Sequence, residues 1–247
     1  MRHLLHIAVV LASVLAASSA FAYRPSHTPI SEAERGLTAE EALTAAEAGR
    51  SRVAASVNTA KLDDHRRNPK IRLTRGERRS AKSYEQALAR VSFWKDVVGF
   101  KEALLALHGK RPPPGAKTEA DVIARDLIDK IHELSSRWRI GGSALLHNMK
   151  INLGFREKGF CYHFASELRK AIARHDLVWF DSRWGSAWEG NFRESNALVI
   201  TAKGKPFESG LAVDPWRAAG KPFWTTVKGD RFPWVEGFEV EERYEVE

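Results

Sequence analysis

The sequence predicts an α+β protein, with helices in the first two thirds of the chain and strands in the last third. Two patterns lead to this prediction. Apolar residues recur at helical spacing between about residues 38 and 174, whereas short β-rich runs separated by turn residues begin at residue 177. Hydrophobic residues make up 43% of the chain, enough for a packed core. We expect the helices to pack on one side of a small antiparallel sheet.

The predicted helices follow from apolar periodicity and from capping signals. Thr38 and Glu41 have capping-box spacing, and Gly141-Gly142 separates the third predicted helix from the fourth. Residues 60–79 are basic and weakly periodic, which predicts a loop or a frayed helix. The predicted helices cover about residues 38–57, 80–108, 118–134, 143–153 and 161–174.

The predicted strands are short runs rich in β-branched and aromatic residues. Lys203-Gly204-Lys205 has the composition of a hairpin turn between two of them. The Gly-, Ser- and Trp-containing segment 181–195 predicts a loop that could cover the start of the helix at Cys161. The predicted strands cover residues 177–181, 196–201, 211–214, 224–227 and 238–246.

The first 22 residues have the pattern of a secretory signal peptide. Met1-Arg2-His3 supplies positive charge, residues 4–17 are mostly apolar, and Ala20-Phe21-Ala22 predicts cleavage after Ala22. The alternative is a permanent membrane anchor, but the run is shorter than the roughly 20 residues that span a bilayer. No later segment is apolar enough to span one. We therefore expect a periplasmic or secreted protein.

Charge is uneven along the rest of the chain. Residues 23–120 hold 19 Lys/Arg and 12 Asp/Glu, whereas residues 121–247 hold 19 of each. We predict a basic, partly helical or disordered extension at 23–79, followed by one domain at 80–247. A basic cluster in the extension predicts an anionic envelope component as partner rather than nucleic acid, although an exposed helix face that binds nothing has the same pattern. The main candidates for binding this partner are Arg66, Arg67, Arg78 and Arg79.

The single cysteine, Cys161, is the main candidate for chemistry. One cysteine excludes an intramolecular disulfide. Cys161 follows Gly159 at the start of a predicted helix, where the dipole and free amides favour the thiolate, so we expect a lowered pKa. The alternative is a small buried apolar residue. No metal-ligand spacing or glycine-rich phosphate loop is present, so the sequence predicts neither a metal nor a cofactor.

A helix-borne Cys followed by strand-borne polar groups resembles the layout of papain-like and transglutaminase-like thiol enzymes, and the order of the groups resembles the transglutaminase-like branch. Cys161 matches the nucleophile of these enzymes. Residues 196–200 match the strand that normally carries a His, and residues 212–216 match the strand that carries an Asp, here Asp214. The resemblance covers about residues 155–220. It implies a related fold and an acyl-transfer site with Cys161 as nucleophile.

A second resemblance is to a family of uncharacterised bacterial exported proteins and lipoproteins. That family carries a Glu-His-Asn strand motif, and this chain has Ser195 at the position of the His, between Glu194 and Asn196. The resemblance implies no established activity. It rests on the segments 152–154, 159–163, 194–200, 214–217 and 232–234.

The catalytic base is missing from the expected place, since all 9 histidines lie at or before residue 175. Ser195 and Asn196 cannot accept a thiol proton near neutral pH. Asn196 could bind an oxyanion, and Asp214 could orient a base. His163 stands two positions after Cys161 and points away on a regular helix, whereas His147 could fold back from the preceding helix.

Two functional hypotheses follow. The first is a non-catalytic descendant of a thiol-enzyme fold that binds an envelope component or peptide through its basic segment and an aromatic groove. Trp184, Trp188 and Trp216 are the groove candidates, although tryptophans are also common core residues. The alternative is an active thiol hydrolase or acyltransferase in which Cys161 attacks a peptide or cell-wall amide.

Overall fold

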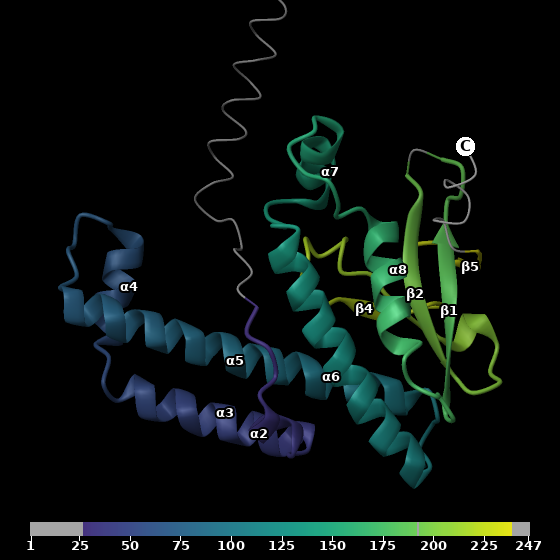
Figure 1. Ribbon diagram of the computed structural model, residues 1–247, viewed down its shortest axis with the longest axis horizontal. Coiled ribbons are helices and arrows are strands. Elements are labelled where there is room, and N and C mark those ends of the chain that lie inside the picture. The colour runs from purple at the N-terminus through teal and green to yellow at the C-terminus, as the bar shows by residue number, and fades with distance from the viewer. Residues whose placement is uncertain (1–26, 192, 239–247) are drawn as a thin grey trace, which may run out of the picture.

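The computed structural model describes residues 27–191 and 193–238. In these residues the protein has seven α-helices followed by one five-stranded antiparallel sheet, so the predicted α+β class is confirmed (Figure 1). The predicted signal peptide and most of the predicted strand 238–246 lie outside the described residues. The helices are α2 (Glu32–Arg35), α3 (Ala39–Ala54), α4 (Thr59–Arg67), α5 (Arg75–Ala106), α6 (Pro114–Arg137), α7 (Ala144–Asn152) and α8 (Cys161–Ile172).

Two predicted helix boundaries were wrong, and local capping explains both. Residues 60–79 were expected to be loop or frayed helix, but α4 occupies much of this segment and α5 begins at Arg75. Thr74 caps α5 by accepting from the amide of Glu77, whose carboxylate accepts from the amide of Thr74. Helix α6 begins at Pro114 rather than Thr118, because proline is well suited to a first helical position, where no amide partner is needed.

The sheet has the strand order β4-β3-β2-β1-β5, with every neighbouring pair antiparallel. The prediction that residues 181–195 form a loop was wrong for residues 181–187, because the longest pairing of the sheet runs from Phe180 opposite Ala202 to Ala187 opposite Ser195. Small residues in this segment suggested a loop, but they let β1 lie between two other strands. The strands are β1 (Phe180–Ala187), β2 (Ser195–Ala202), β3 (Leu211–Val213), β4 (Trp224–Thr226) and β5 (Val235–Glu236).

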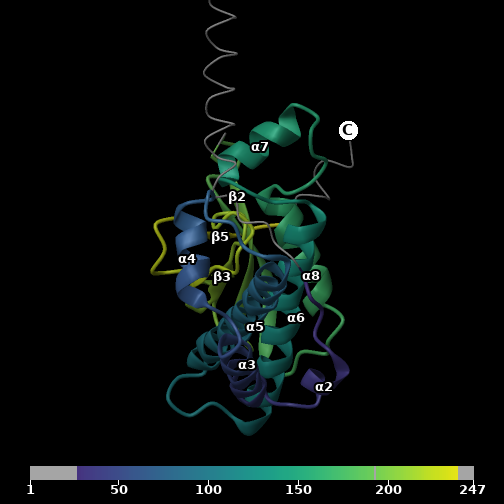
Figure 2. The same cartoon turned by 90° about the vertical axis from the view of Figure 1, so that its left-hand side faces the viewer.

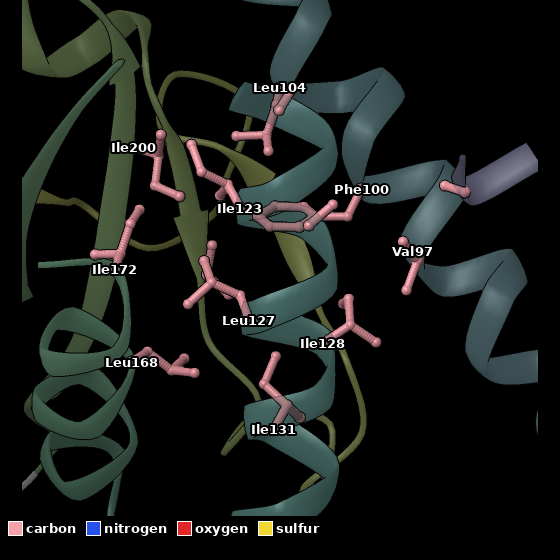
Figure 3. Close-up of a cluster of buried hydrophobic side chains, with 14 of the residues drawn as sticks. Val97, Phe100, Leu104, Ile123, Leu127, Ile128, Ile131, Leu168, Ile172 and Ile200 are labelled. Atoms are coloured by element: carbon pink, nitrogen blue, oxygen red, sulfur yellow. The ribbon is translucent and has the colours of Figure 1, made fainter. Parts of the chain in front are cut away.

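The main core lies between the helices and one face of the sheet. Helix α8 packs against β1 and β2, α6 lies behind α8, and α5 crosses α6 (Figures 1 and 2). Side chains from α5, α6, α8 and β2 meet in this layer, among them Phe100, Leu127, Leu168 and Ile200 (Figure 3). The opposite face of the sheet is also buried, under a smaller cluster that includes Phe207 and Trp234.

The segment before α5 shares this core. Ile30, Ala39 and Ala42 belong to the same buried cluster as α5, α6 and the sheet, and the Arg125 guanidinium of α6 donates to the carbonyl oxygens of Glu34 and Leu37. The predicted boundary between residues 79 and 80 falls inside α5. Within residues 27–191 and 193–238, no helix is both long and apolar enough to cross a membrane.

Glu34 fastens the N-terminal segment to α5. Its carboxylate accepts from Arg90 Nε at 2.6 Å and from Trp94 Nε1 at 3.2 Å. Burial alone would raise the pKa of Glu34, but hydrogen bonds from Arg90, Ser31 and Trp94 outweigh burial and lower the pKa to about 2. A carboxylate with a depressed pKa stabilises the fold above its unfolded pKa, near 4.5, and this stabilisation is lost as pH falls through about 2.

We therefore expect Glu34→Gln to lower the free energy of unfolding at pH 7 by about 1–2 kcal/mol, a figure that allows for solvent screening at this partly exposed site. The difference from the parent should shrink as pH falls from about 4.5 towards 2. Urea unfolding at a series of pH values measures it. The matched control is Glu32→Gln, an exposed neighbour on the same helix. An equal loss of stability in both variants, or one independent of pH, would contradict this role.

Candidate functional site

A cavity of about 890 Å³ opens beside the start of α8. Helix α7 stands at this end of the molecule, beyond the start of α8 (Figure 1). The lining contains five aromatic rings, four asparagines, two arginines and one acidic residue, and Cys161 is part of it. We call it the Cys161 cavity; it is lined by Leu145, Asn148, Asn152, Phe160, Cys161, Tyr162, Trp188, Asn191, Arg193, Glu194, Asn196, Trp216, Arg231 and Phe232.

Cys161 is the first residue of α8, as the sequence predicted. Gly159, just before it, has φ of +125°, and a Cβ atom there would collide with the side chains of His147 and Ile140. The turn into α8 therefore requires glycine. The helix start is capped by His163, whose Nδ1 accepts from the amides of Gly159 and Phe160 at 3.1 and 3.2 Å. These contacts fix where the thiol lies.

Asn196 of β2 faces the thiol and is held in one orientation. Its Oδ1 accepts from Trp184 Nε1 at 2.9 Å and from Ser186 Oγ at 3.1 Å. Because an indole N–H can only donate, the atom facing it must be the amide oxygen. The Nδ2 atom is then directed towards Glu194 Oε1, 3.2 Å away, and towards the Cys161 sulfur. Trp184, predicted as a binding residue, is only 2% exposed and positions Asn196 instead of lining the cavity.

The prediction of a lowered thiol pKa was wrong. Burial, together with the negative charge of Asp214, raises the pKa of Cys161 to about 11. Hydrogen bonds to the sulfur from the amides of Asn196 and Tyr162 and from the Asn196 side chain lower the pKa, but they do not outweigh burial. The sequence argument counted the amides at the helix start and could not count the desolvation. The thiol, 8% exposed, lies 3.9 Å from the carbonyl oxygen of Glu194.

Asp214 is paired with an arginine and not with a histidine. Arg217 donates to Asp214 through its backbone amide and Nε, both at 3.3 Å, and its Nη atoms contact Asp230 at 2.8 and 2.7 Å. Burial raises the pKa of Asp214 to about 6, although the charge and hydrogen bonds of Arg217 act in the other direction. Asp230 also accepts from Trp234 Nε1. This network joins the segments around residues 214–217 and 230–234 behind the cavity wall.

Ser195 faces away from the thiol. Successive residues of a strand point to opposite faces, so Ser195 lies with Ala187 and Ala197 over the smaller cluster, whereas Asn196 lies on the α8 face. Its side chain is buried, and its hydroxyl finds no hydrogen-bond partner among the described residues. Ser195, where the sequence resemblance leads one to expect a histidine, therefore does not point into the Cys161 cavity.

Neither alternative histidine reaches the thiol as a base. The Nδ1 atom of His163 is used in capping α8. His147 is buried behind Gly159, where its Nε2 donates to the carbonyl oxygen of Lys158 at 3.0 Å, and burial lowers its pKa. Among the described residues that line the cavity, none is a histidine.

Two of the predicted tryptophans do line the cavity. Trp216 Nε1 donates to Asn148 Oδ1 at 2.9 Å, which ties the segment after β3 to α7. The Trp188 ring contacts Phe232 with centroids 4.5 Å apart, and the guanidinium of Arg193 lies 5.1 Å from the Trp188 ring centre. Trp188 has φ of +53°, a left-handed conformation that a bulky residue adopts only where its surroundings hold it.

The other predicted binding residues lie elsewhere. Arg66 and Arg67 end α4, and Arg78 and Arg79 lie in the first turns of α5; none of the four lines the cavity. Within the described parts of the chain, no group of three or more His, Cys, Asp or Glu side chains could hold a metal ion.

Several cavity residues carry no signal in the sequence. Asn148 and Arg231 come from separate segments and have no motif spacing, whereas Asn191 and Arg193 lie in the segment 181–195, which was expected to cover the start of α8 but gave no individual residue a role. Asn152, Phe160, Tyr162 and Phe232 belong to segments that the sequence marked, but nothing in the sequence gave these side chains a role. Comparison with known proteins finds no matching family model, no similar curated protein and no similar solved structure.

Alkylation of Cys161 tests the thiol environment directly, because the chain has 1 Cys. We expect the rate of reaction with iodoacetamide to rise with a midpoint near pH 11, above the value of about 8.5 for a free thiol. Asp214→Asn should move the midpoint down, because it removes a negative charge near the sulfur. Circular dichroism confirms that the variant is folded. A midpoint below about 8.5 in the parent would show an activated thiolate and contradict this interpretation.

The orientation of Ser195 yields a second prediction. Ser195→His should leave the alkylation rate of Cys161 unchanged and lower stability by about 1–3 kcal/mol, because the imidazole is forced into the packed cluster around Ala197 and Phe207. Asn196→His is the matched comparison, since it places the same ring on the α8 face. If Ser195→His accelerated alkylation more than Asn196→His did, our assignment of the two faces would be wrong.

Proposed function

We propose that this protein binds an acidic glycopeptide or peptide of the cell envelope in the Cys161 cavity and does not use Cys161 as a nucleophile. The observation that carries the proposal is the make-up of the cavity. Aromatic rings and amide side chains surround a thiol that lacks a base, and the charged groups on the lining are two arginines and one glutamate.

The lining chemistry favours such a ligand. Rings such as those of Trp188 and Trp216 offer flat apolar faces to sugar rings and peptide groups. The amide of an asparagine both donates and accepts, which suits hydroxyl and peptide groups. Glu194 is already engaged, since its carboxylate accepts from Gly190 N and from Asn196 Nδ2. The Arg193 and Arg231 guanidinium groups are then the charges on the wall that attract a carboxylate of the ligand.

The state of the thiol supports binding over catalysis. With a pKa of about 11, roughly one Cys161 side chain in ten thousand is a thiolate at pH 7. Acyl transfer by a cysteine needs a neighbouring base to remove the proton. In this site Asn196 and Tyr162 supply N–H donors to the sulfur, and these donors can equally hold a carbonyl oxygen of a bound ligand.

An active thiol hydrolase or acyltransferase is the alternative, and one observation favours it. Asp214 is buried, its pKa is raised to about 6, and its charge acts on Cys161. A carboxylate with that pKa could accept the thiol proton when a ligand rearranges the site. On this alternative the fold is a transglutaminase-like one that works without the strand histidine.

For both the binding function and the hydrolase alternative, we propose that the protein is exported, with residues 1–22 as the signal peptide.

Muramyl dipeptide, an acidic glycopeptide, is the probe for this proposal. We expect saturable binding by isothermal titration calorimetry, and Trp216→Ala should weaken it about tenfold or more because a stacking face is lost. If Arg193 pairs with the ligand carboxylate, Arg193→Gln should weaken the binding of muramyl dipeptide. The same change should leave the binding of a neutral chitin oligosaccharide unchanged. Trp224→Phe is the control, because Trp224 packs against Phe100, outside the cavity lining.

Two results would count against the proposal. Equal affinity in the parent and in Trp216→Ala would place binding outside the Cys161 cavity. Mass spectrometry after long incubation should return the probe intact, and a Cys161-dependent cleavage product would establish the hydrolase alternative instead.

A further inference from the structure

The end of the molecule opposite the sheet carries a concentrated positive charge. Helix α4, the connection that follows it and the first turns of α5 form this end (Figure 1). Residues 58–86 contain nine Lys and Arg and four Asp and Glu, a balance of +5. We call this end the basic tip; its exposed cations other than Arg66 are Arg67, Lys70, Arg72, Arg75, Arg78, Arg79 and Lys82.

The acidic groups of this end are mostly committed to other partners. Glu77 pairs with Lys61 at 2.6 Å and caps α5. Asp63 and Glu85 both pair with Arg66, at 2.9 and 3.1 Å. Within the described residues, no ion pair neutralises the seven exposed cations of the basic tip. Their charge is therefore available to an external anion.

The basic tip is a folded platform with a small core of its own. Leu62 of α4, Leu73 of the connection and Ala81 of α5 are buried together, with Val57 and Tyr84 packed against them. The Asn58 side chain caps α4 and Thr74 caps α5. Because both helices are fixed in this way, the seven cations are presented on ordered backbone, where they can meet a surface together.

The shape and composition of the basic tip favour an extended anionic surface. A cleft of about 80 Å³ lies beside Lys61 and Leu62 and is too small for a nucleotide. Residues 58–86 contain no Phe or Trp, and their one Tyr, Tyr84, packs against the small core of the tip, so no Phe, Trp or Tyr ring is offered at the surface to stack on a base. From this we infer that the basic tip docks the protein on a lipid bilayer that carries anionic headgroups, independently of ligand binding in the Cys161 cavity.

Vesicle binding tests this inference. The chain beginning at Tyr23, which contains every residue that the structure describes, is mixed with phosphatidylcholine vesicles with or without about 30% phosphatidylglycerol, and bound protein is measured by sedimentation. We expect binding only to the anionic vesicles, with release in about 0.5 M NaCl because salt screens exposed charges. Equal binding to neutral vesicles, or no binding to either kind, would overturn the inference.

Paired charge variants locate the contact. The tip variant carries Arg67→Gln, Arg72→Gln, Arg78→Gln and Arg79→Gln, and the vesicle partition coefficient should fall about tenfold or more. The control removes the same charge elsewhere, through Lys110→Gln, Arg111→Gln, Lys117→Gln and Lys205→Gln, which are also exposed. An equal fall in both variants would mean that net charge, and not the basic tip, drives binding.

Two further measurements separate this inference from other outcomes. Muramyl dipeptide binding should be unchanged in the tip variant, so failure of the cavity proposal and failure of the bilayer proposal give different results. Binding to a DNA duplex is measured by fluorescence anisotropy at the same salt concentrations. If the duplex bound through the same four arginines while vesicles did not, the tip would be a nucleic-acid surface and the bilayer inference would be wrong.

Discussion

The Cys161 cavity depends on the packing of α8 against β2, because this contact places the first turn of one element over the first residues of the other. The Asn196 amide fixes the contact chemically. Its oxygen is held by Trp184 and Ser186 of β1, so its nitrogen must point towards α8 and the thiol. A buried amide with both ends satisfied tolerates one orientation and stabilises one strand register. The thiol, the donors around it and the cavity wall follow from that register.

The same packing decides the chemistry of Cys161. A cysteine at a helix start gains stabilisation of its thiolate from nearby amides, and three such donors reach the sulfur. Burial costs the thiolate its hydration, and Asp214 adds a negative charge in a medium that screens poorly. These two effects exceed the amide contribution and keep the proton on the sulfur. A structure that hides the thiol so well is better suited to forming the wall of a binding site than to attacking an amide.

Periodicity predicted most of the helices and the position of Cys161 at the start of α8, because burying one face of a helix imposes a regular spacing on the sequence. The sequence prediction missed all of β1 after Asp181, since Gly185 and Ser186 are poor strand formers that are accepted where neighbouring strands supply the partners. The side of the sheet to which the Ser195 side chain points could not be predicted either. It depends on a register set by pairing with β1, and a shift of one residue exchanges the two faces. The cavity itself draws on segments far apart in the chain, and neither charge nor spacing links them.

The long helix α5 connects the basic tip to the part of the molecule that contains the sheet. Its first turns belong to the basic tip, whereas Phe100 and Leu104 near its other end belong to the core beside the sheet. The α5 helix spans 32 residues, so at about 1.5 Å per residue its ends are nearly 50 Å apart. That distance exceeds the Debye length at physiological salt several-fold, so the charges at the first turns of α5 are screened from groups near its last turns. Because α8 and the sheet lie on the other side of the molecule from α4 (Figure 1), a protein docked through the tip would hold its cavity away from the anionic surface, free to take a ligand from the surrounding medium.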